Sequence, residues 1–162
     1  MAKMTINTPK TLAMQLDQLS NQIPDIAEKA LHAGASVLAD AIRQNLNALP
    51  EDRFRKLSDG ESFVGVPERQ KRDLQESLGI TPVKVDRHGY YNIKIGFDGY
   101  GSYPTQKYSK GLPNQLLARS IESGSSVRQK TPFVGPAVKS AKKAVLQAMQ
   151  EEADRAIEQL TK

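Results

Sequence analysis

Histidines and acidic residues are the side chains of this sequence that could hold a metal or move protons, and their spacing builds no recognisable site. No His-x-x-x-His or carboxylate–histidine pattern around His32 or His88 indicates a metal site. The adjacent acids Glu51-Asp52 and Glu151-Glu152 resemble pairs that usually lie on solvated faces, and nothing nearby in the sequence indicates a cleft. We therefore expect a half-buried helical His32, a solvated turn at His88, and no metal or other cofactor.

Two other stretches have only a superficial likeness to functional motifs. GFDGYGS, residues 96–102, lacks both the Gly-Lys-Ser/Thr ending of a phosphate-binding loop and the Gly-x-Gly-x-x-Gly spacing. Ser120 and Ser123 lie outside any Gly-x-Ser-x-Gly setting, and the absence of cysteine excludes a thiolate nucleophile and a disulfide framework. A hydrolase or nuclease needs a nucleophile–base set or a metal cluster, so we do not expect an enzyme.

Size and composition indicate one modest domain. The 162 residues suit a single domain over residues 1–162, and the low aromatic content of 6% implies a core of Ala, Leu, Ile and Val. A net charge of +5 permits contact with nucleic acid without requiring it. No apolar run approaches the roughly 20 residues that span a bilayer, and residues 1–10 do not resemble a secretory signal. We expect a soluble, cytoplasmic product with no membrane contact.

Apolar residues at helical spacing predict long helices at both ends of the chain. Thr8-Pro9 suits the start of a first helix, with Thr8 as its cap, and Pro24 is expected to end it and begin a second helix over residues 24–47. Several apolar positions of the second helix are small, which predicts close packing against another element. The last helix is expected from Pro136, as its first residue, to about Leu160.

Shorter elements are predicted between these helices. Residues 3–7 suit a short strand, residues 69–78 a short helix capped by a left-handed Gly79, and residues 116–121 a short helix or strand. Residues 83–85 and 91–95 alternate as the strands of a hairpin around Gly89. This order of elements predicts an α+β fold, with long amphipathic helices packed on a small antiparallel sheet.

Two long loops, at about 50–68 and 97–113, separate the predicted elements. Loops longer than about 12–15 residues are uncommon in compact domains unless they are functional or disordered. The first mixes charges with Phe54 and Phe63, and is either a flexible surface loop or a segment that becomes ordered on a partner. The second interleaves tyrosines and lysines, which suit a protein-binding surface, a plain flexible loop, or base stacking with phosphate contacts. Its residues are Tyr100, Tyr103, Lys107, Tyr108 and Lys110.

The charges of the last helix run against its dipole. Lysines occupy its first turns and acids its end, whereas a helix dipole favours the opposite order. These residues are Lys139, Lys142, Lys143, Glu151, Glu152, Asp154 and Glu158. The charged face of this helix either is solvated and has no binding role, or its basic end in one subunit meets an acidic surface of the next subunit. Head-to-tail contacts of the second kind close into a ring when the rotation between subunits allows it.

The segment from Asn114 to Ala137 carries a family resemblance. It contains Glu-x-Gly-Ser at 122–125 and Pro-Phe-x-x-Pro-Ala at 132–137, with Phe133 as an apolar anchor where the last helix begins. Together with Leu74, Ser77, Leu78 and Gly96, this pattern resembles the minor tail, tail-completion and head–tail joining (neck) proteins of long-tailed bacteriophages. It departs from that pattern at Ser125, where threonine is usual, in a segment before Glu122 that is poor in aromatics, and in a longer Gly-Tyr loop.

The resemblance implies a structural protein of the virion, located in the tail or neck and, during assembly, in the host cytoplasm. It implies a ring of six or twelve copies at the head–tail junction or top of the tail, in contact with connector or stopper proteins and with tail-terminator or tail-tube proteins. Viral DNA would pass through the lumen without sequence recognition. The expected subunit-interface residues are Tyr100, Tyr103, Lys107, Tyr108, Glu122, Arg128, Phe133, Lys139, Lys142, Lys143, Glu151 and Glu152.

A small basic nucleic-acid-binding protein is the alternative interpretation. Such a protein needs a basic face, and its affinity for DNA falls steeply with salt. The basic residues of this chain are dispersed along the sequence rather than gathered in a stripe, which disfavours this alternative.

Overall fold

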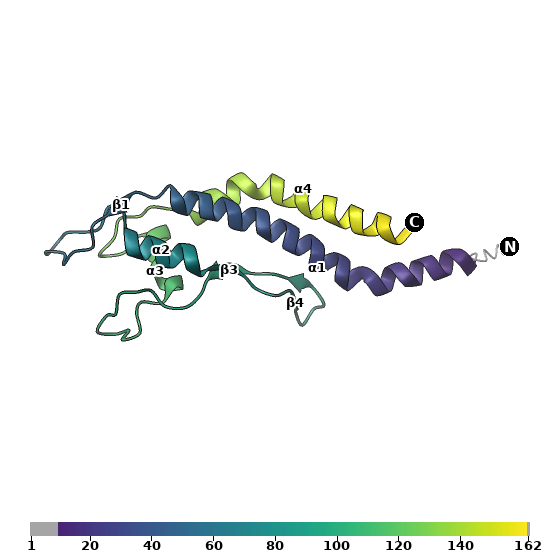
Figure 1. Cartoon of the computed structure of the whole chain (residues 1–162), viewed down its shortest axis with the longest axis horizontal. Helices are drawn as coiled ribbons and strands as arrows, with labels where there is room; N and C mark the ends of the chain where they lie inside the picture. Colours follow the sequence, from purple (N-terminus) through teal and green to yellow (C-terminus); the bar gives the residue numbers. More distant parts are fainter. Residues whose placement is uncertain (1–9, 162) are drawn as a thin grey trace, which may run out of the picture.

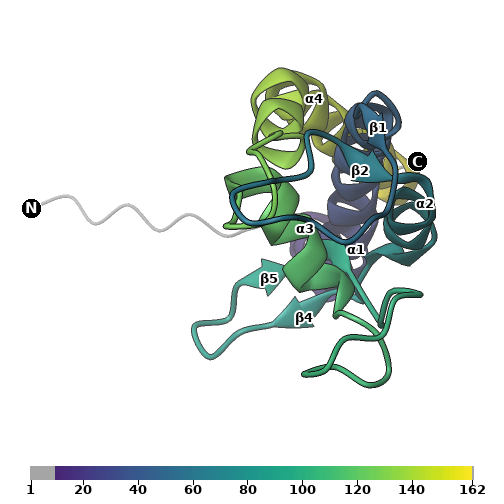
Figure 2. The same ribbon diagram turned by 90° about the vertical axis from the view of Figure 1, so that its left-hand side faces the viewer.

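A pair of long helices forms one side of the molecule, and shorter elements gather towards one end of it (Figure 1). The computed structural model describes residues 10–161; the predicted strand at residues 3–7 and helix start at Thr8-Pro9 lie outside them. The long helices are α1, Lys10–Asn47, and α4, Val134–Thr161, and they lie side by side in both views (Figures 1 and 2). They run antiparallel: Asn45 near the end of α1 donates a hydrogen bond to the carbonyl of Phe133 at the start of α4, and Gly34, earlier in α1, lies beside Met149, later in α4.

The prediction of two N-terminal helices divided at Pro24 is wrong, because α1 continues through that residue. Proline removes one backbone hydrogen bond and bends a helix, but the helical turns on either side can persist. Figure 1 shows the ribbon of α1 changing direction in its purple, N-terminal part. The prediction that the helix ends before Pro50 is confirmed. Ile23, the residue before Pro24, is 50% exposed.

Small residues allow α1 and α4 to approach closely, as the sequence predicted. A Cβ added to Gly34 of α1 would lie 2.5 Å from Cγ of Met149 on α4. Alanines continue the buried contact on both helices. They are Ala30, Ala35, Ala39, Ala141 and Ala156.

Short strands and two short helices complete the described fold. Strands β1, Glu51–Asp52, and β2, Val66–Pro67, pair in parallel and close the base of the first long loop. Helix α2 spans Glu68–Ser77, and α3 spans Asn114–Ser123. The antiparallel pairs are β3 with β6, Leu78–Ile80 with Ile95–Phe97, and β4 with β5, Lys84–Val85 with Tyr91–Asn92.

The antiparallel strands form one interrupted hairpin, which confirms the predicted hairpin and extends it. Its turn contains Gly89, whose φ of 83° suits a residue without a side chain. Gly79 does not cap α2, because the chain passes directly into β3, where Gly79 pairs with Gly96. Four helices with small antiparallel strand pairs, in the part of the chain that the structure describes, confirm the α+β class. That residues 1–162 form one domain stays a prediction.

The apolar core lies where the end of α1, the start of α4, α2, α3 and the β3–β6 pair meet. Phe133 is at its centre, 1% exposed, with its ring 5.9 Å from that of Phe97. This confirms the expected apolar anchor. The other core residues are Ile42, Leu46, Leu49, Val66, Leu74, Leu78, Leu117, Ala118, Ile121 and Ala137. The same core therefore positions both long loops, which begin or end next to its members.

Candidate functional site

The carboxylate of Glu122, near the end of α3, holds the start of α4. Its Oε2 accepts the N–H groups of Phe133 and Val134, both at 2.8 Å, and its Oε1 accepts the N–H of Gly135 at 2.9 Å. The first four N–H groups of a helix have no partner within it. Counted from Phe133, the residue that precedes α4, these groups belong to positions 133–136, and Pro136 has no N–H. The carboxylate therefore accepts every N–H group of this set. The helix starts at Val134 rather than at Pro136 as predicted.

Two opposing influences act on the pKa of Glu122. Burial raises it, while the three N–H donors and the nearby charge of Lys130 lower it and prevail, so that the pKa lies below its ordinary value. The carboxylate is thus ionised at neutral pH. Its charge also complements the positive end of the α4 dipole, where α4 itself has no acid in its first turn.

Arg128 is an internal cross-link, and the sequence offered no signal for this role. The side chain is 5% exposed, donates to the carbonyl of Gly65 and to Oε1 of Gln70, both at 2.7 Å, and lies 5.2 Å from the ring centre of Phe63. Burial lowers its pKa, partly opposed by the charge of Asp52, yet an arginine remains charged. Two backbone hydrogen bonds of Phe63, to Val127 and from Gln129, fasten the same loop to the same turn.

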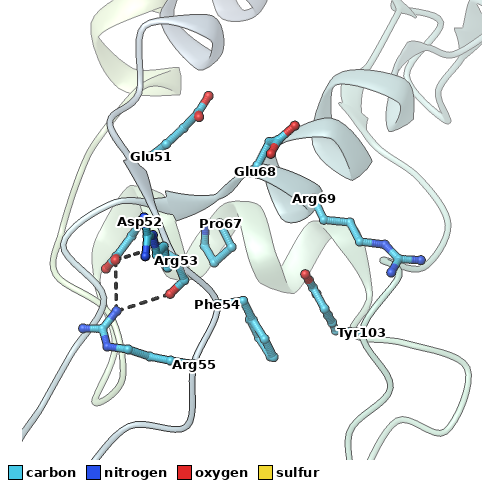
Figure 3. A pocket seen from close by; sticks show the side chains of 9 residues that line it. All are labelled: Glu51, Asp52, Arg53, Phe54, Arg55, Pro67, Glu68, Arg69 and Tyr103. Atoms are coloured by element: carbon cyan, nitrogen blue, oxygen red, sulfur yellow. Dashed lines mark hydrogen bonds and ion pairs between the residues drawn. The ribbon is translucent and has the colours of Figure 1, made fainter.

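The two long loops meet at a cleft beside β1 and the start of α2 (Figure 3). These elements lie at the end of the molecule away from the last turns of α4 (Figure 1). The rings of Phe54 and Tyr103 stack with centres 4.0 Å apart and planes 5° apart. The cleft has a volume of about 730 Å³. We call it the loop cleft; it is lined by Glu51, Asp52, Arg53, Phe54, Arg55, Pro67, Glu68, Arg69 and Tyr103.

Each of the three acids of the loop cleft has an ion-pair partner within the chain. The ion pairs are Glu51 with Lys71 at 3.1 Å, Asp52 with Arg55 at 2.9 Å, and Glu68 with Arg72 at 2.9 Å. The expectation that nothing near Glu51-Asp52 forms a cleft is therefore wrong: the parallel β1–β2 pair brings these acids beside the start of α2.

Arg53 and Arg69 differ from these acids, since within residues 10–161 neither forms an ion pair. The Arg69 guanidinium lies 5.5 Å from the ring centre of Tyr103. The loop cleft thus offers two cations without an ion pair among the described residues and the exposed part of Phe54, whose ring also lies 6.1 Å from that of Phe63. This combination suits a ligand that carries a carboxylate or phosphate beside a flat group.

Asp52 also determines the shape of the first loop. Its Oδ2 accepts the N–H of Val64 at 3.1 Å, and its Oδ1 accepts the N–H of Arg53 at 2.7 Å. Burial raises the pKa of Asp52, but these hydrogen bonds and the charge of Arg55 outweigh it and leave the pKa below its ordinary value. The hydrogen bond from Val64 to Asp52 thereby joins the beginning and the end of this loop.

The remaining predicted interface residues are scattered over the surface. Tyr100 is 59% exposed, and Lys107 lies over the ring of a half-buried Tyr108 at 5.5 Å. On α4, Lys139, Lys142, Lys143 and Glu151 are exposed, and Glu152 accepts a hydrogen bond from Arg155 at 2.7 Å. Phe133 and Arg128 are buried within the chain. Of the predicted interface residues, Tyr103 contacts the first loop through Phe54, and Glu122 contacts Phe133. The acids of α4 lie towards the end of the molecule opposite the loop cleft (Figure 1).

His32 is half-buried within α1 and His88 is exposed in the hairpin turn, as expected. Residues 10–161 contain no group of three His, Asp or Glu side chains that could hold a metal ion. None of the described helices has the length and apolar character to cross a bilayer.

Comparison with known proteins connects this geometry to a family. No curated protein and no solved structure matches the chain. Residues 10–103, more than half of the chain, match the family model described as "Bacteriophage HK97-gp10, putative tail-component". The matched residues include α1, α2, the hairpin and every residue that lines the loop cleft. The chain therefore belongs to the HK97 gp10-like family of bacteriophage tail components.

Proposed function

We propose that this protein is a non-enzymatic component of a long-tailed phage virion that forms a ring at the head–tail junction or the top of the tail, where it completes the tail or joins it to the head. The observation that carries the proposal is the family match, which covers the part of the chain that builds the loop cleft. A ring of six or twelve copies would contact connector or stopper proteins on one side and tail-terminator or tail-tube proteins on the other.

The subunit contributes a firm framework and an exposed docking end. Glu122 fixes the start of α4, and close packing at Gly34 fixes α4 against α1. At the loop end, Arg128 and the Phe54–Tyr103 stack hold the two long loops against the body and against each other. This arrangement supports loops that present a formed surface to a neighbouring protein, which reduces the entropy lost on docking.

Contacts between copies are proposed along α4. The exposed Lys139, Lys142 and Lys143 lie at one end of the helix and Glu151 and Glu152 at the other, so that the basic end of one copy can meet the acidic end of the next. Charge reversal tests this contact. Lys142→Glu and Glu152→Lys should each weaken ring formation, and a mixture or double variant that restores opposite charges should recover it; failure to recover contradicts the contact.

Viral DNA would traverse the lumen without sequence recognition. A net charge of +5 on a chain with charges of mixed sign suits weak, non-specific contact rather than tight binding. Acids line the loop cleft together with arginines, which further reduces any attraction for the phosphate backbone.

The mass of the purified protein in solution, alone and mixed with connector or tail-tube proteins of the same phage, tests the proposed function. A ring, or a monomer that becomes a ring only with these proteins, is expected. A monomer that ignores them but binds duplex DNA with a steep dependence on salt would contradict the proposal and favour the nucleic-acid-binding alternative.

A further inference from the structure

We propose that the loop cleft binds an acidic peptide segment that carries a flat side chain, presented by another protein of the tail or neck. This inference rests on the proposed function and specifies the chemistry of the partner at one surface. The recognition elements are Arg53 and Arg69 for the carboxylates and the Phe54–Tyr103 stack for the flat group.

Charge is the first argument for an acidic partner. Each acid in the wall already has a cationic partner in the chain, so its charge is offset before any ligand arrives. Arg53 and Arg69 are exposed and have no ion pair among the described residues. A guanidinium binds a carboxylate through two parallel hydrogen bonds, which gives direction as well as attraction.

The aromatic pair supplies the second argument. Phe54 is 52% exposed although its ring is stacked on Tyr103, so part of a large apolar side chain stays open to solvent beside the cleft (Figure 3). The two ring planes are nearly parallel, and the stack joins two loops that are distant in the sequence. Exposed aromatic side chains held in this way are typical anchors of protein–protein contacts. A tyrosine, phenylalanine or proline of the partner would cover the exposed part.

A peptide fits the loop cleft better than nucleic acid does. Glu51, Asp52 and Glu68 line it, and although each is paired, a phosphate backbone would pass close to all three negative charges. A short acidic segment can place single carboxylates at Arg53 and Arg69, whereas a continuous polyanion cannot restrict its charges to these two positions. The wall therefore favours discrete carboxylates over a continuous polyanion.

A different protein fits better than a second copy of this chain. The acids at the end of α4 lie towards the opposite end of the elongated molecule (Figure 1), and in the proposed ring they meet the lysines of the next copy. They are therefore not available to the loop cleft as well. An acidic segment from an adjoining virion protein leaves both contacts possible.

Fluorescence anisotropy with the full chain tests the inference. The probe is a fluorescein-labelled peptide of four acidic residues around one tyrosine, and its control has the acids replaced by their amides. The acidic probe should bind and the amide probe should not. Arg53→Glu and Arg69→Glu should each weaken binding by about fivefold to tenfold, the size expected for one charge-assisted contact at an exposed site.

Arg87→Glu is the matched control variant. Arg87 is exposed in the hairpin turn, and it undergoes the same charge change without lining the cleft. The fold should survive all three substitutions, because the side chains are exposed and an acid at position 69 suits the first turn of α2. Circular dichroism verifies this. Equal weakening by Arg87→Glu would show general charge attraction and overturn the proposed site.

A second comparison examines the aromatic surface. Phe54→Ala should weaken binding of the tyrosine-containing probe. It should weaken binding less for an otherwise identical probe in which alanine replaces the tyrosine. Equal effects on both probes, no binding of the acidic probe, or preference for a duplex DNA over the peptide would overturn the inference. The proposed function is judged separately by ring formation, so wild-type rings together with an inert loop cleft would reject only this inference.

Discussion

The carboxylate of Glu122 accepts the backbone N–H of Phe133 at 2.8 Å, and this contact joins the two halves of the 122–137 motif. Gly124, with a φ of 78°, turns the chain after α3, and a Cβ at Gly135 would lie 3.0 Å from Oε1 of Glu122. The motif is thus a structural device: one carboxylate from α3 determines where α4 begins and seats Phe133 in the core.

Replacement of Glu122 by glutamine should destabilise the fold. The amide retains one acceptor oxygen and directs an NH2 group towards backbone N–H donors, so at least one donor loses its partner. We expect the free energy of unfolding to fall by about 1–3 kcal/mol in urea denaturation. Glu76→Gln, at an exposed position of α2, is the control and should have little effect. Equal stabilities of the two variants would argue against the capping role.

The stability contributed by Glu122 should also depend on pH. Because the folded-state pKa lies below its ordinary value, this contribution is complete above the unfolded-state pKa of about 4.3 and is lost as pH falls through the folded-state pKa. The difference in unfolding free energy between the wild type and Glu122→Gln should therefore be constant near neutral pH and shrink below about pH 4. Urea titrations from pH 7 to pH 3 measure it, and a constant difference over that range would contradict the prediction.

Gly34 and Met149 should show strong energetic coupling. Alanine at 34 would improve helix propensity by about 1 kcal/mol but would place Cβ against Cγ of Met149, at a cost of about 1–3 kcal/mol. Gly34→Ala should therefore destabilise the wild type, yet have a smaller cost or a gain in a Met149→Ala variant, where only the contact with Cγ1 of Val145 at 3.2 Å remains. A double-mutant cycle by chemical denaturation measures the coupling. Additive effects would show that the helices adjust freely at this contact.

Arg128→Met should loosen the first long loop. The substitution leaves the Gly65 carbonyl and the Gln70 amide without their partner, and we expect a loss of about 2–3 kcal/mol of stability. Amide hydrogen exchange at Phe63, whose N–H donates to Val127, should accelerate. Arg119→Met, at an exposed position of α3, is the control. Unchanged exchange at Phe63 would show that the backbone hydrogen bonds alone hold the loop.

The sequence by itself determined the features that depend on neighbouring residues. Helical spacing located α4 and most of α1, alternation around Gly89 located the hairpin, and the prolines around Phe133 indicated a buried anchor. Local rules also produced the error at Pro24. A proline predicts a helix end from its own geometry, but the residues on both sides retained their helical conformation in one continuous helix.

Only the tertiary structure decided which distant residues meet. Phe54 and Tyr103 belong to loops without regular periodicity, so no spacing predicts their stack or the cleft beside it. Arg128 has the composition of a surface residue, and its burial depends on partners 58 and 63 positions away in the chain. Backbone propensity and apolar periodicity act over a few residues, whereas a cleft and a buried charge need the whole core to bring their parts together.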